Sequence, residues 1–168
     1  MSKVVMIIAQ ISFRDEELLE TKKVLEANGI KVKVAAPKLE RAVGKLGAEV
    51  MPDLSLEQIE LDDFDAIVFV GGPGAADFFN DKIILTMAKD AYENEKVVAA
   101  ICIAPSILAN AGLLNGIRAT AFPSEERNLL TKGASYTGNV VEVSGRIITG
   151  RGPEAATEFG QRIVKALK

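Results

Sequence analysis

The sequence contains no histidine among its 168 residues, and this absence limits the possible chemistry more than any other feature. Catalytic pairs in which an imidazole activates a cysteine or a serine are excluded. Zinc sites built on histidine are excluded as well. A homo-oligomer would have the same restriction, because every copy carries the same sequence.

Cysteine is nearly absent too, since Cys102 is the single one. It cannot form a disulfide within the chain, so no oxidising compartment is implied, and one thiol cannot build a Cys-rich metal site. We therefore expect no metal and no other cofactor. A lone thiol is instead a candidate reactive group.

The chain also lacks a basic excess and a long apolar run. It has 20 Lys and Arg against 23 Asp and Glu, whereas nucleic-acid binding needs a clustered basic face. The longest apolar run near the start, residues 4–9, is too short to span a bilayer, and no signal-cleavage pattern follows it. We expect a cytoplasmic protein that binds neither nucleic acid nor membranes.

The pattern of strands and helices predicts one α/β domain over residues 1–168 with a mainly parallel sheet. Short apolar runs, typical of strands buried on both faces, alternate with helical patterns. The predicted strands are 3–9, 30–36, 66–70, 97–101 and 117–121, with short edge strands at 41–43 and 49–51 and a hairpin of 140–143 and 146–149 turning at Ser144-Gly145. The predicted helices are 14–28, 81–94, 104–111, 124–130 and 153–167, with a helical turn at 55–59.

Cys102 follows the predicted strand 97–101 directly and precedes a predicted helix. Ligands of parallel sheets gather at the carboxyl ends of the strands, and a turn this sharp directs the side chain outward, as in a nucleophile elbow. The start of the following helix should lower the pKa of the thiol and make it nucleophilic. A buried structural cysteine is the open alternative.

Two other segments end at the same edge of the predicted sheet. The glycine-rich loop 71–74 lacks the residues of a phosphate-binding loop. The N–H group of Gly72 can instead contribute to an oxyanion hole. The open alternative is that the loop is only a tight turn. Glu16 and Glu17 open the first predicted helix, where acidic residues are favoured in any case. Adjacent helical positions diverge, so only one of the two can face Cys102.

Taken together, these segments resemble the ThiJ/PfpI superfamily of class I glutamine amidotransferase-like proteins. The resemblance implies a flavodoxin-like three-layer sandwich, a frequent homodimer and a reactive Cys102 whose partner is a protonated Glu17. It also implies oxyanion donors at the N–H groups of Gly72 and Ile103. The matching residues, in order, are Phe13-x-Asp15-x-Glu17-Leu18, Phe64-Asp65-Ala66, Gly71-Gly72, Ala99-Ala100-Ile101-Cys102-x-x-Pro105 and Gly150-Arg151-Gly152-Pro153.

Departures from the family pattern help to choose among its activities. The peptidase branch has a histidine directly after its cysteine, where this chain has Ile103, and this disfavours an intracellular peptidase. The deglycase branch has a histidine before a proline, where this chain has Phe122, yet the segment 149–153 resembles that branch more closely. We therefore expect a slow glyoxalase or deglycase hydrolase that acts on small reactive carbonyls through Cys102 and Glu17. A non-catalytic oxidative-stress sensor or a chaperone that uses the same oxidisable cysteine is the alternative.

Overall fold

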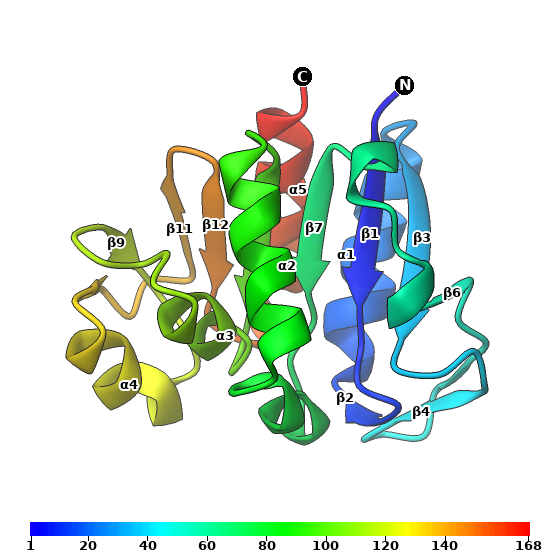
Figure 1. The fold of residues 1–168 in the computed structure, drawn as a ribbon, viewed down its shortest axis with the longest axis horizontal. Coiled ribbons are helices and arrows are strands. Elements are labelled where there is room, and N and C mark those ends of the chain that lie inside the picture. The colour runs from blue at the N-terminus through cyan, green and yellow to red at the C-terminus, as the bar shows by residue number, and fades with distance from the viewer.

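A seven-stranded sheet forms the middle layer of the protein (Figure 1). The computed structural model describes residues 1–168. All neighbouring strands in this sheet are parallel except the hairpin at one edge, which is antiparallel. This arrangement confirms the predicted α/β class. The strands, in spatial order, are β11 (Val141–Ser144), β12 (Ile147–Gly150), β8 (Val97–Ile101), β7 (Ala66–Phe69), β1 (Lys3–Ile7), β3 (Lys31–Ala36) and β6 (Leu54–Ser55).

Helices cover both faces of the sheet (Figure 1). Helices α1 (Asp15–Ala27) and α5 (Ala156–Ala166) lie on one face, and α2 (Lys82–Glu93) and α3 (Pro105–Asn110) lie on the other. Side chains of β1 alternate between the two resulting cores, which explains its continuous apolar sequence. None of the helices combines the length and the hydrophobicity that a membrane-spanning helix requires.

A separate three-stranded sheet corrects part of the predicted layout. It consists of β2 (Ile11–Phe13), β4 (Ala42–Gly44) and β5 (Glu49–Val50). The segments 41–43 and 49–51 were expected at the edge of the main sheet, but they pair here instead. Strand β2 was not predicted, because three residues are too few to show a period. Its central residue, Ser12, also has a left-handed φ of 66°.

The remaining elements are short and lie outside the main sheet. The predicted strand 117–121 is only β9 (Arg118–Ala119), which pairs with the unpredicted β10 (Ser135–Tyr136). The hairpin turns at Gly145 and Arg146, one residue later than predicted, because Ser144 pairs with Ile147. Helix α4 (Glu126–Thr131) completes the set, and short 3-10 helices cover Leu56–Gln58, Leu61–Asp63, Pro73–Phe78, Pro123–Glu125 and Pro153–Ala155.

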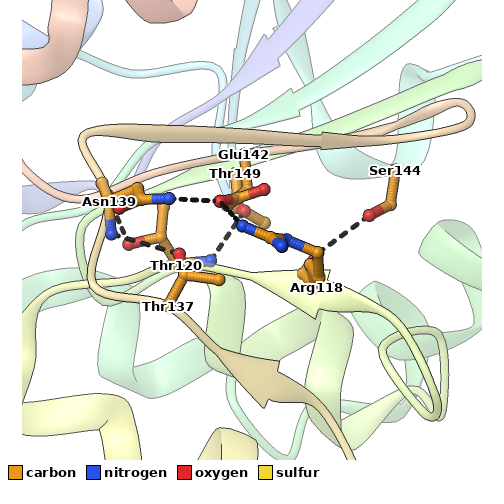
Figure 2. Close-up of polar contacts among 7 residues, drawn as sticks. All are labelled: Arg118, Thr120, Thr137, Asn139, Glu142, Ser144 and Thr149. Atoms are coloured by element: carbon orange, nitrogen blue, oxygen red, sulfur yellow. Dashed lines mark hydrogen bonds and ion pairs between the residues drawn. The ribbon is translucent and has the colours of Figure 1, made fainter.

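A polar network around Glu142 connects the hairpin to the segment that begins with β9 (Figure 2). The carboxylate of Glu142 accepts hydrogen bonds from Asn139 Nδ2 at 2.6 Å and from Arg118 Nη2 at 3.3 Å. Thr120 donates its hydroxyl to the carbonyl oxygen of Asn139 at 2.6 Å. The N–H group of Thr120 donates to the hydroxyl oxygen of Thr149 at 3.0 Å. The network therefore attaches Thr120 and Asn139 to the hairpin at the edge of the main sheet.

The charge of Glu142 should contribute to stability in a pH-dependent way. Burial acts to raise the pKa of Glu142, but hydrogen bonds from Asn139 and Arg118 lower it below the ordinary value of 4.5. The contribution is therefore present above about pH 4.5 and is lost as the pH falls through the lower folded-state pKa. We expect Glu142→Gln to reduce the free energy of unfolding by about 1–2 kcal/mol at neutral pH and by less in acid, as measured by urea denaturation.

Glu60→Gln is the matched control, because Glu60 is exposed and its side chain forms no hydrogen bond. It should leave the free energy of unfolding within about 0.5 kcal/mol of the wild-type value. Equal effects of the two substitutions at neutral pH would contradict a structural role for the Glu142 carboxylate.

Candidate active site

Cys102 occupies a strained turn between a buried strand and a helix. Strand β8 ends at Ile101, and Cys102 has a φ of 66°, a left-handed conformation that costs a non-glycine residue about 1–3 kcal/mol. Its N–H group donates to the carbonyl oxygen of Gly150 at 2.9 Å, and its carbonyl oxygen accepts from the N–H group of Phe122 at 2.8 Å. The turn predicted from the sequence is therefore present and is held on both sides.

Glu17 lies beside Cys102 at the start of α1, with none of its surface exposed. Its Oε1 atom accepts a hydrogen bond from the N–H group of Gly71 at 2.9 Å. Its Oε2 atom is buried and has no hydrogen-bond partner of ordinary geometry. Among side chains, the thiol of Cys102 has the largest effect on the pKa of this carboxyl group, which it lowers. Glu16 instead pairs with Arg14 at 2.9 Å. Of the two adjacent acidic residues, Glu17 is therefore the one that faces the thiol.

The glycine loop comes so close to these two side chains that a larger residue does not fit. A Cβ atom at Gly71 would lie 2.6 Å from the Cβ atom of Cys102 and 2.7 Å from Oε1 of Glu17. Gly72 has a φ of 101°, which L side chains rarely adopt. The backbone N–H groups of Gly72 and Ile103 both lie close enough to the sulfur of Cys102 to lower the pKa of its thiol. The structure thus brings together all four residues that the resemblance indicated.

Burial dominates the electrostatics of the pair. It raises the pKa of Glu17 to about 7. Burial, followed by the negative charge of Glu17, raises the pKa of Cys102 to about 12, although the N–H groups of Gly72 and Ile103 oppose this shift. The expected lowering by the following helix is therefore wrong, because α3 has only six residues and the loss of solvation outweighs it. Glu17 and Cys102 together carry at most one negative charge at neutral pH.

A small pocket of about 170 Å³ opens onto Cys102. Drug-sized ligands usually occupy pockets of roughly 300–1,000 Å³, so this one suits a smaller molecule. Nine residues line it: Arg14, Lys45, Gly72, Pro73, Cys102, Ile103, Phe122, Ser124 and Pro153.

Sequence reasoning did not assign a role to three of these lining residues, Arg14, Lys45 and Ser124. Arg14 lies within the segment that resembles the family, but no pattern distinguished it. Lys45 belongs to the turn between β4 and β5, which comes from a distant part of the chain. No group of three or more acidic or thiol side chains lies close enough together to hold a metal ion.

Comparison with known proteins identifies the family and the fold of the chain. Residues 2–166 match the DJ-1/PfpI family. A crystal structure of a ThiJ/PfpI domain protein from Brachyspira murdochii superposes with a TM-score of 0.96 at 34% identity, covering 98% of this chain and 95% of that one. This match confirms the flavodoxin-like fold expected from the resemblance.

Two relatives carry names that describe an activity. A deglycase from Pyrococcus abyssi is 32% identical over 98% of this chain and 99% of its own length. A glutathione-independent glyoxalase from Caenorhabditis elegans is 30% identical over 90% of this chain and 81% of its own length. The chain therefore covers most of the length of both relatives.

Removing the charge of Glu17 should change the reactivity of the thiol. Because that charge raises the pKa of Cys102, we expect Glu17→Gln to lower this pKa. Alkylation of Cys102 by iodoacetamide at mildly alkaline pH should then become about tenfold faster, as measured by intact mass. Glutamine matches the neutral carboxyl group in size, so the variant should fold.

Glu20→Gln provides the control, since Glu20 is exposed on the same helix. It should alkylate at the wild-type rate. An unchanged rate in Glu17→Gln would show that the carboxyl group does not act on the sulfur.

Proposed function

This chain belongs to the DJ-1/PfpI family, and we propose that it is a slow cysteine-dependent enzyme of the glyoxalase or deglycase type. Its substrates would be small reactive carbonyl compounds. The observation that carries the proposal is the buried carboxyl group of Glu17 beside the thiol of Cys102, which itself lines a small pocket. The names of the two relatives, a deglycase and a glyoxalase, support the same class.

The first step is addition of the thiol to an aldehyde. The sulfur of Cys102 forms a bond to the carbonyl carbon, and the electron pair of the carbonyl double bond moves to oxygen. The thiol proton, moved by Glu17, ends on that oxygen, so the product is a neutral hemithioacetal. The N–H groups of Gly72 and Ile103, which act on the sulfur in the free protein, would stabilise the developing negative oxygen.

The second step requires a group that both accepts and returns a proton. For a 2-oxoaldehyde, Glu17 would remove the proton from the carbon attached to sulfur and return it to the neighbouring carbon, while the hydroxyl proton moves to the oxygen on that neighbouring carbon. The result is a thioester of a 2-hydroxy acid, which water hydrolyses to the free acid and the regenerated thiol. With burial raising its pKa to about 7, Glu17 is partly protonated at neutral pH and suits both directions.

The missing histidine should slow this reaction rather than prevent it. A positioned general acid or base contributes about 10²–10⁴-fold to rate. Phe122 stands where the deglycase branch has its histidine, and Ile103 stands where the peptidase branch has one. The small pocket, together with Ile103, does not favour hydrolysis of a peptide.

The buried Oε2 atom of Glu17 supports one alternative, a redox sensor. When protonated, this oxygen has its donor free to bind an oxygen added to the sulfur of Cys102. Oxidation to a sulfinate would then be stabilised without turnover.

We also infer that two copies of the chain associate, as the resemblance implies. Three large apolar side chains are exposed in or beside the small sheet of β2, β4 and β5: Ile11 at 70%, Leu46 at 63% and Met51 at 66%. Sedimentation should give a mass near twice 17.9 kDa for the wild type and a lower mass for Leu46→Lys. A wild-type chain that stays monomeric at high concentration would contradict the association.

A paired assay of wild type and Cys102→Ser tests the proposed activity. We expect the wild type to form lactate from methylglyoxal faster than buffer and Cys102→Ser to lose this excess, because serine lacks the nucleophilic sulfur. Glu20→Gln should keep the wild-type rate.

Activity that persists in Cys102→Ser would place the chemistry elsewhere. Absence of turnover in the wild type, with clean addition of two oxygen atoms to Cys102 by dilute peroxide in intact-mass spectra, would support the sensor instead.

A further inference from the structure

The pocket at Cys102 has cationic lining residues and no acidic ones. Arg14 and Lys45 are among its nine lining residues, and none of the nine is Asp or Glu. The chain as a whole has a net charge of −3. The charge balance at this opening is therefore opposite to that of the protein as a whole.

Backbone hydrogen bonds hold both cationic residues at the pocket. The N–H group of Arg14 donates to the carbonyl oxygen of Gly71 at 2.9 Å, and the N–H group of Lys45 donates to the carbonyl oxygen of Phe13 at 2.9 Å. The buried carboxylate of Asp15 accepts from the N–H groups of Leu46 and Ala48, both at 2.8 Å. The turn that carries Lys45 is therefore attached to the start of α1, next to Glu17.

Lys45 contributes most of the unbalanced charge. The guanidinium group of Arg14 forms two hydrogen bonds with Glu16, both at 2.9 Å, so its charge is largely balanced. Lys45 is exposed and forms no ion pair within the chain. The carboxyl group of Glu17 is fully buried, does not line the pocket and forms no ion pair with Lys45.

We infer that the preferred substrate carries a carboxylate that Lys45 binds while its carbonyl group meets Cys102. This inference rests on the proposed function and specifies its substrate class: small 2-oxoaldehydes that also carry a free carboxylate. The pocket of about 170 Å³ encloses the reacting part, and the exposed Lys45 meets the carboxylate at the opening. An ion pair at such an exposed position should favour the anionic substrate by about fivefold.

Two substrates that differ only in charge test this inference. They are 4-carboxyphenylglyoxal and its primary amide, two 2-oxoaldehydes of nearly the same size, compared at equal concentrations. We expect kcat/KM to be about fivefold higher for the carboxylate in the wild type, through a lower KM, and we expect added salt to reduce this ratio. Lys45→Gln should bring the ratio close to one.

Lys31→Gln is the matched control, because Lys31 is exposed at the start of β3, at the opposite end of the strands from Cys102. It makes the same change of charge and should keep the wild-type ratio. Equal kcat/KM values for the two substrates in the wild type, or a preference that persists in Lys45→Gln, would overturn the inference.

Alkylation separates this inference from the proposed function, because it requires no turnover. Iodoacetate carries a carboxylate and iodoacetamide is neutral, and both modify the thiol of Cys102. The ratio of the iodoacetate rate to the iodoacetamide rate should be about three- to fivefold higher in wild type and Lys31→Gln than in Lys45→Gln. Equal ratios in the three proteins would overturn the charge selection even if turnover is observed. A lowered ratio in Lys45→Gln would support it even if neither substrate is turned over.

Discussion

The contact between the Glu17 carboxyl group and the Cys102 thiol determines how the rest of the site is arranged. Both groups are buried, and burial raises the pKa of each, to about 7 and about 12. Two negative charges at this contact would repel each other with little water to screen them, so the pair titrates as a unit. The N–H group of Gly71 on one carboxyl oxygen makes the burial of Glu17 possible.

The surrounding backbone leaves room for the contact between Glu17 and Cys102 and holds Cys102 in its strained conformation. Position 71 requires glycine, because a Cβ atom there would lie within 2.7 Å of the Cβ atom of Cys102 and of Oε1 of Glu17. Cys102 keeps its left-handed conformation because Gly150 and Phe122 bind its N–H and carbonyl groups. Strain of this kind persists only where the surrounding structure opposes its release. The network of Glu142 and Asn139 extends this support, since it holds Thr120, two residues before Phe122 (Figure 2).

Without histidine, the site has one residue, Glu17, that can transfer protons beside the thiol at neutral pH. Its raised pKa makes this feasible, whereas an exposed carboxyl group would be almost fully ionised and a poor acid. The lining of the pocket includes the cationic residues Arg14 and Lys45 and no carboxyl group. In the proposed function, the buried Glu17 transfers protons, and Lys45 at the pocket opening recognises the charge of the substrate.

The sequence alone determined the features that depend on local order. Short apolar runs predicted β1, β7 and β8, the strand pattern of residues 30–36 predicted β3, and the position of Cys102 directly after β8 predicted its turn. The absence of histidine restricted the chemistry whatever fold the chain adopts. The resemblance assigned Glu17, although helical spacing by itself left Glu16 equally possible. Strand β2 was missed, since it is too short to show a period.

Only the tertiary structure decided the pKa direction of Cys102 and the presence of Lys45 at the pocket. The sequence predicted a lowered pKa from the helix start, but the number of atoms that exclude water from a thiol depends on every element packed around it. Lys45 reaches the pocket because Asp15 binds the turn after it. Spacing along a chain reports which residues share a helix face or strand, whereas burial and contacts between distant segments exist only once the chain has packed.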